Sequence, residues 1–119
     1  MPLRAIGRRS NRGAVKTEYR GAVYASKSEA SYARYLDWLI GKGDVSSWER
    51  QVKVPLVVCG VKVCDIIPDF LVTYRDGSTE YVEVKGHKTA VYNLKLKLFR
   101  AIHPKAKYRI VSAKEALAL

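Results

Sequence analysis

The sequence has 119 residues, of which 48% are hydrophobic and 28% charged, and this composition suits one folded globular domain. Its 22 Lys and Arg against 11 Asp and Glu give a formal net charge of +11, which favours a polyanionic partner, most commonly nucleic acid. The sequence contains no apolar run of membrane-spanning length, and its two cysteines, Cys59 and Cys64, make neither a disulfide framework nor a zinc-ligand pattern, so we expect a cytoplasmic protein with reduced thiols.

Residues 1–18 are predicted to be a flexible basic arm ahead of a single domain at 19–119, because glycines and short polar residues interrupt any periodicity. Such an arm either follows the phosphates of a nucleic acid or is a solvated tail, and its sequence leaves both open. The candidate DNA-binding residues are four basic side chains of the arm and three others: Arg8, Arg9, Arg12, Lys16, Arg20, Lys27 and Lys88.

The next elements follow one another as helix, three strands, helix, strand and short helix. Ser26 and Glu29 form a capping-box pattern that begins a helix, which Gly41 or Gly43 ends. Strands are predicted at 48–60, at 61–74 with a bend at Pro68, at 79–86 and at 107–113, with helices at 89–104 and 112–119. The helix between the last two strands predicts a right-handed crossover to a parallel neighbour. We therefore predict an α/β fold with a mixed four-stranded sheet flanked by helices.

The turn at 75–78 decides which residues of the central hairpin face each other. A two-residue loop would mix charge into both faces of the hairpin. A bulged type I turn, with Arg75 opposite Thr79, would instead pair Phe70 with Val84 and Val72 with Val82. This register places Asp69, Glu83 and Lys85 on the other face, with Asp69 opposite Lys85 and Leu71 opposite Glu83.

Two carboxylates and a lysine on one face of a sheet have two interpretations. Asp69, Glu83 and the backbone carbonyl of Val84 offer hard oxygen ligands that suit Mg²⁺, while Lys85 could position or activate a water. A surface cluster of ion pairs is the alternative, and spacing alone does not separate the two.

The residues Pro68-Asp69-Phe70 followed by Glu83-Val84-Lys85 resemble the signature of the PD-(D/E)XK nuclease superfamily. The resemblance extends over about residues 19–113. Within this superfamily, the sequence is similar to small phage-encoded nucleases of unknown function and to phage endonuclease I-type Holliday-junction resolvases. It implies a restriction-endonuclease-like αβββαβ core and metal ligands at Asp69, Glu83 and the carbonyl of Val84.

The same resemblance implies a catalytic lysine at Lys85 and a helix-borne acid at Glu29. Glu29 starts the inward stripe of its helix, so we prefer a role at the site over a purely capping role. Gln51 and His87 are weaker candidates for residues that line the site.

We expect a phage-encoded, Mg²⁺-dependent endodeoxyribonuclease of the host cytoplasm, in which Mn²⁺ substitutes. Its DNA partner is duplex or branched, and we favour a structure-selective activity, either on branched DNA such as a Holliday junction or as nicking. Junction cleavage would require a homodimer, which the sequence leaves open. The alternatives are a DNA-binding protein of the same fold without catalysis and a basic RNA-binding protein that needs no metal.

Overall fold

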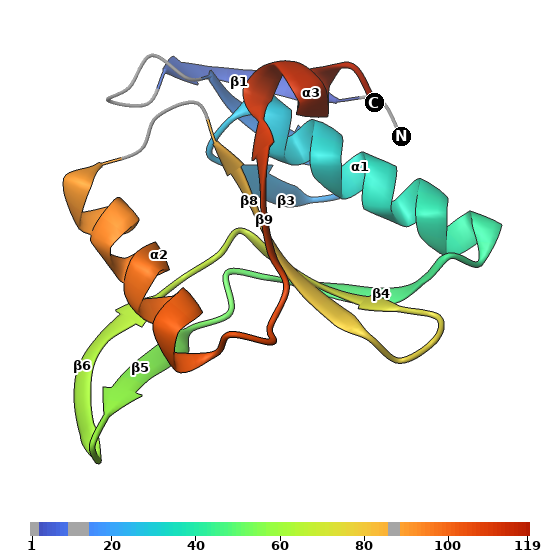
Figure 1. The fold of residues 1–119 in the computed structure, drawn as a ribbon. Coiled ribbons are helices and arrows are strands. Elements are labelled where there is room, and N and C mark those ends of the chain that lie inside the picture. The colour runs from blue at the N-terminus through green and yellow to red at the C-terminus, as the bar shows by residue number, and fades with distance from the viewer. Residues whose placement is uncertain (1–2, 10–14, 86–88) are drawn as a thin grey trace.

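The structure is a computed structural model that describes residues 3–9, 15–85 and 89–119, although the side chains of 5–9 and of Lys85 lie outside the description. Its centre is a four-stranded sheet in the order β4-β7-β8-β9 (Figure 1). The strands are β4 (Val45–Arg50), β7 (Phe70–Tyr74), β8 (Thr79–Lys85) and β9 (Tyr108–Ser112). The first three are antiparallel and β9 is parallel to β8. The mixed α/β fold is therefore confirmed.

Helices and smaller sheets cover both faces of this sheet (Figure 1). One face carries α1 (Lys27–Lys42), α3 (Ala113–Leu117) and a second sheet of β1 (Arg4–Arg9), β2 (Val15–Tyr19) and β3 (Ala22–Tyr24). The other face carries α2 (Ala90–Ile102) and a hairpin of β5 (Val54–Val58) and β6 (Val61–Ile66). Each face has its own buried cluster, so the sheet lies between two cores.

The helices begin and end where their capping residues predict. Ser26, Thr89 and Ser112 each accept a hydrogen bond from the backbone N–H three residues later, which satisfies a donor that the first turn leaves open. Gly43 ends α1 in the left-handed region with φ 87°, as expected for a helix-ending glycine. No helix within the described residues is long and apolar enough to cross a membrane.

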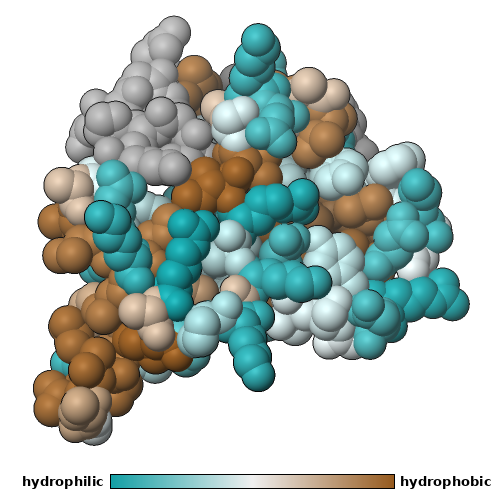
Figure 2. Space-filling model, in the orientation of Figure 1, coloured by the Kyte–Doolittle hydropathy of each residue, from teal (hydrophilic) through white to brown (hydrophobic). Residues whose placement is uncertain are grey.

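The two long predicted strands are each divided in two. Gln51 adopts φ 51° between β4 and β5, and the chain bends again at Pro68 between β6 and β7. The outer halves therefore leave the sheet and pair as the β5–β6 hairpin, with its tight turn at Cys59-Gly60. Figure 2 shows that hydrophobic surface gathers on this hairpin, where Val57, Val58, Val61 and Val63 are exposed.

The prediction of a flexible arm over residues 1–18 is wrong for β1 and β2. β2 alternates inward and outward residues, with Thr17 and Tyr19 buried, and it pairs with both β1 and β3. Tyr19 also donates a hydrogen bond to Asp37 of α1 at 2.6 Å. The overlooked signal was the period of two in Val15, Thr17 and Tyr19, because the high charge of the segment drew attention instead.

The predicted register of the central hairpin is also wrong, although the predicted faces are right. Phe70 pairs with Val82 and Thr73 with Thr79, so the strands lie two positions from the predicted register. The loop is Arg75-Asp76-Gly77, in which the Gly77 N–H donates to the Tyr74 carbonyl and Gly77 adopts φ 91°. This is the expected bulged type I turn, displaced by one residue.

The physical reason for the displacement lies in the polar groups around the turn. Asp76 accepts hydrogen bonds from the N–H and the hydroxyl of Ser78, at 2.9 and 2.6 Å, and this holds Ser78 outside the loop. Glu80 then lies opposite Val72 on the apolar face, where Tyr74 and Arg109 satisfy its carboxylate. A shift by two keeps every residue on its original face, so the apolar pattern could not distinguish the two registers.

Candidate active site

Three carboxylates converge from three different elements. Glu29 is on the first turn of α1, Asp69 directly precedes β7, and Glu83 is near the end of β8. Glu29 and Glu83 are 8% and 7% exposed, and Asp69 is half-buried. Buried carboxylates are rare unless they are paired or hold a cation, so this cluster requires a physical explanation.

The backbone fixes Asp69 from two sides. Its carbonyl accepts a hydrogen bond from the Gln51 N–H at 3.0 Å, and its Oδ2 accepts one from the Val84 N–H at 2.8 Å. The buried Pro68 precedes it and limits the local backbone. Asp69 therefore lies beside Glu83 and Val84. The sequence had predicted a position opposite Lys85 instead.

The pKa of Asp69 reports how closely the three acids approach one another. Burial, and then the charge and hydrogen bond of Glu29 and the charge of Glu83, raise the pKa of Asp69 from 3.8 to about 9, against the opposing effect of the Val84 N–H. A hydrogen bond between two carboxyl groups requires a proton on one of them. Asp69 therefore keeps its proton near neutral pH in the metal-free protein.

Glu29 serves the helix cap and the site at once. Its backbone N–H donates to Ser26 Oγ at 3.1 Å, which is one half of the predicted capping box. Its side chain hydrogen-bonds Asp69. Different atoms of Glu29 therefore make the capping contact and the contact to Asp69, so the two roles predicted from the sequence do not exclude each other.

Glu83 contacts a pair of tyrosines that were not among the predicted site residues. Burial, and then hydrogen bonding to Tyr108 and the charge and hydrogen bond of Glu83, raise the pKa of Tyr92 well above its ordinary value. The two tyrosine hydroxyls hydrogen-bond each other. Tyr92 is on α2 and Tyr108 on β9, so they join Glu83 to the elements that cover this face. The sequence signal that could have revealed this contact was Tyr92, because a buried tyrosine hydroxyl on the inward side of a helix usually has a hydrogen-bond partner.

Comparison with known proteins places the chain in a family. A family model described as "Protein of unknown function (DUF1064)" matches residues 9–116, which is most of the chain. The chain belongs to the DUF1064 family. No curated protein shows significant similarity to it. All three carboxylates and both tyrosines lie within the part that matches DUF1064.

The remaining predicted site residues of this DUF1064 chain divide into two groups. Gln51 is exposed and contributes its backbone N–H, while Lys16, Arg20 and Lys27 are exposed, and Arg20 pairs with Asp37 at 3.3 Å. The others fall, wholly or by their side chains, outside the described residues: Arg8, Arg9, Arg12, Lys85, His87 and Lys88.

The donor set of the DUF1064 site fits a hard divalent cation. Within the described residues, no three His, Cys, Asp or Glu side chains already form a group that could hold a metal ion. Mg²⁺ does not require three, because it commonly binds through one or two carboxylates, with waters and substrate phosphate completing its shell. Asp69 and Glu83 supply those two carboxylates, and a cation there would offset the repulsion that raises the pKa of Asp69.

Proposed function

We propose that the protein is a Mg²⁺-dependent endodeoxyribonuclease that hydrolyses phosphodiester bonds. The observation that carries this proposal is the convergence of Glu29, Asp69 and Glu83 in a protein of net charge +11. A strongly basic protein attracts a polyanion, whereas a buried acidic cluster repels one unless a cation lies between them. A divalent cation bound by Asp69 and Glu83 makes the two features compatible.

Each residue of the site has a distinct task in this proposal. Asp69 and Glu83 bind the cation, and when bound Mg²⁺ supplies electrostatic stabilisation to a phosphoryl oxygen. Glu29 holds Asp69 through its hydrogen bond, and Tyr92 orients Glu83. Supporting contacts of this kind fix the direction of ligand oxygens and raise metal affinity.

In this proposal, Lys85 acts on the water that attacks the phosphate. It follows Glu83 by two positions in β8, and strand alternation predicts the same face for both. Its ammonium would stabilise the charge that develops as the water oxygen bonds to phosphorus and the bond to the deoxyribose oxygen breaks. The attacking water loses one proton to solvent, and the leaving oxygen takes up one proton and becomes a hydroxyl group.

The order of elements supports the resemblance to the PD-(D/E)XK superfamily. From α1 the chain runs through β4, β7, β8, α2 and β9, with the β5–β6 hairpin inserted between β4 and β7. We infer that these elements form the restriction-endonuclease-like αβββαβ core that the resemblance implies. Glu29 lies on the first helix, Asp69 before the second core strand and Glu83 in the third, which supports this inference.

Cleavage of plasmid and junction DNA tests the proposal. Supercoiled plasmid and a four-way junction would be incubated with the protein in Mg²⁺, Mn²⁺ or EDTA, beside the variants Asp69→Asn, Glu83→Gln and Lys85→Ala. Glu49→Gln is the matched control, because it removes an equivalent charge from an exposed position on β4. We expect cleavage in Mg²⁺ that each of the three site variants reduces by at least a hundredfold and that Glu49→Gln leaves unchanged.

Two outcomes would contradict the proposal. If the wild-type protein binds DNA but cuts neither substrate in either metal, it is a binding protein of the same fold. If Asp69→Asn and Glu83→Gln cut as well as the wild type, the reaction occurs elsewhere.

A further inference from the structure

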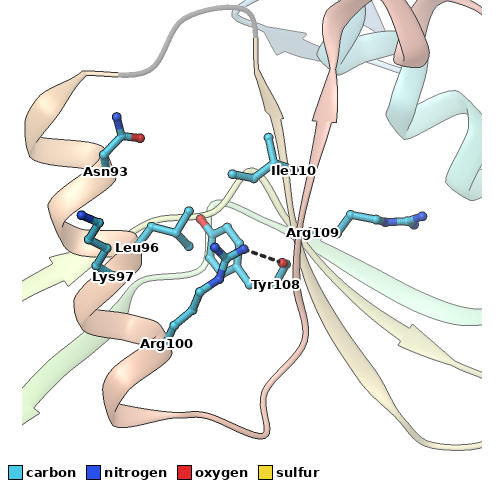
Figure 3. A pocket seen from close by; sticks show the side chains of 7 residues that line it. All are labelled: Asn93, Leu96, Lys97, Arg100, Tyr108, Arg109 and Ile110. Atoms are coloured by element: carbon cyan, nitrogen blue, oxygen red, sulfur yellow. Dashed lines mark hydrogen bonds between the residues drawn. The ribbon is translucent and has the colours of Figure 1, made fainter.

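A pocket of about 710 Å³ lies between α2 and β9, and of its lining residues only Tyr108 belongs to the site described so far. Its helix wall presents Asn93, Lys97 and Arg100, and its strand wall includes Tyr108 and Ile110 (Figure 3). The three polar helix residues are spaced by four and three positions, so they share one face of α2. Arg100 donates a hydrogen bond to the Tyr108 carbonyl at 3.4 Å, which directs its guanidinium across the pocket.

The segment that forms this pocket is rich in positive charge. Residues 84–114 contain no Asp or Glu and nine basic residues: Lys85, Lys88, Lys95, Lys97, Arg100, Lys105, Lys107, Arg109 and Lys114. Arg109 pairs with Glu80 and points away from the pocket, on the opposite face of β9 (Figure 3). Among the described residues, no carboxylate forms an ion pair with Lys97 or Arg100. Two neighbouring cations on one helix face repel each other unless an anion lies between them.

The pocket adjoins the carboxylate site. Ile110, on the strand wall, is the register partner of Glu83 in the parallel pairing of β8 and β9. The hydroxyl of Tyr108 hydrogen-bonds Tyr92, and Tyr92 hydrogen-bonds Glu83. Paired strands lie about 5 Å apart, so the strand wall of the pocket is directly beside the strand that carries Glu83.

We propose that this pocket binds a backbone phosphate of a DNA strand and thereby holds the strand across the carboxylates. The planar guanidinium of Arg100 offers paired donors to phosphate oxygens, Lys97 adds a point charge, and the amide of Asn93 adds a neutral donor. Such contacts fix the register of a nucleic acid without reading its sequence. That the held strand is also cut rests on the proposed function, whereas the binding itself does not.

Binding without cleavage tests the proposal in the full chain. Fluorescence anisotropy of a labelled duplex and of a single strand would be measured in EDTA across a range of salt, for the wild type and for Lys97→Ala/Arg100→Ala. The control is Arg34→Ala/Lys42→Ala, which removes the same two residue types from α1, on the other side of the sheet.

We expect the pocket variant to bind DNA about tenfold more weakly. The slope of log K against log salt should also fall by about one, because one phosphate contact contributes about one to that slope. The slope of the α1 control should differ from the wild-type slope by less than about 0.5. Equal effects of the two double variants would overturn the proposal, since the loss would then follow net charge and not the pocket.

A second measurement uses the unmodified protein and distinguishes the source of the phosphate. Lysine acetylation would be mapped by mass spectrometry without ligand, with DNA, or with inorganic phosphate at matched ionic strength. We expect DNA to protect Lys97 and not Lys42, and inorganic phosphate to protect neither. Protection by inorganic phosphate alone would make the pocket a site for free anions and overturn the proposal. If the pocket variant loses DNA binding and the wild-type protein cuts no DNA, only the nuclease function is refuted and the phosphate site stands.

Discussion

Asp69 is the residue at which stability and proposed function oppose each other. The backbone N–H of Val84 favours its charged form, but burial and the two neighbouring glutamates favour the neutral form more strongly. The folded protein therefore holds a proton that the unfolded chain releases near pH 4. Strain of this kind at a cluster of acids is typical of a site that a ligand completes.

The conflict at Asp69 predicts how stability depends on pH. Because its folded pKa of about 9 exceeds the unfolded value of 3.8, its contribution to stability is complete below the unfolded pKa and is lost as pH rises towards 9. In EDTA, urea unfolding should show higher stability at pH 5.5 than at pH 8. Asp69→Asn keeps the acceptor for the Val84 N–H and removes the charge, so at pH 8 it should stabilise the fold by about 0.5–2 kcal/mol.

Added Mg²⁺ should separate the wild type from this variant. In 10 mM Mg²⁺ the wild-type unfolding temperature should rise at pH 8, as ligand linkage requires, and Asp69→Asn should show no such rise. Asp65→Asn is a suitable control, since Asp65 pairs with Lys62 at 3.0 Å on the β5–β6 hairpin. An equal response to Mg²⁺ in wild type and Asp69→Asn would show that Asp69 is not a ligand.

At the scale of elements, the turn before β8 sets the position of Glu83 relative to Asp69. Gly77 has φ 91°, a backbone conformation that a residue with a Cβ adopts at a cost. A Cβ placed there meets no atom within 4 Å, so backbone strain is the only penalty. Gly77→Ala should destabilise the protein by about 1–2 kcal/mol.

The matched comparison for this prediction is Gly41→Ala in the last turn of α1. A Cβ added at Gly41 would also meet open space, but the backbone there is helical, so alanine should stabilise by up to about 1 kcal/mol. If the turn is as described, chemical denaturation shows that Gly77→Ala lowers the free energy of unfolding and Gly41→Ala raises it. A neutral effect of Gly77→Ala would mean that the loop adopts another turn.

The elements also differ in how well their sequences predict them. Helices with capping residues such as Ser26 and Thr89 were predicted well, because the cap is a local interaction that sequence reveals. The face of Asp69 and Glu83 was predicted too, since strand alternation depends only on odd or even position. The bend at Pro68 was predicted from the proline, but the break in the strand at 48–60 was not, because the left-handed backbone of Gln51 has no sequence signal of its own. The link of Tyr92 to Glu83 depends on a contact between α2 and β8 that only the tertiary structure shows.

At the scale of the whole molecule, one hydrophobic core joins the amino-terminal sheet to the sheet that bears the site. Tyr19 and Tyr24 pack in the same buried cluster as Phe70 and Val82. A cluster shared by two sheets makes them unfold together, so the site cannot be stable without the amino-terminal strands.

Tyr19 tests this coupling, because it is 3% exposed and donates to Asp37, which also accepts from Trp48 of β4. Tyr19→Ala should lower stability by about 3–5 kcal/mol, through the cavity and the lost hydrogen bond, in a single transition. Val23→Ala in β3 changes a side chain that is 48% exposed and should stay within about 0.5 kcal/mol of the wild type. Far-ultraviolet circular dichroism and tryptophan fluorescence, which reports Trp38 on α1 and Trp48 on β4, should give coincident unfolding curves. Two separate transitions would show that the amino-terminal sheet folds on its own and that the site does not depend on it.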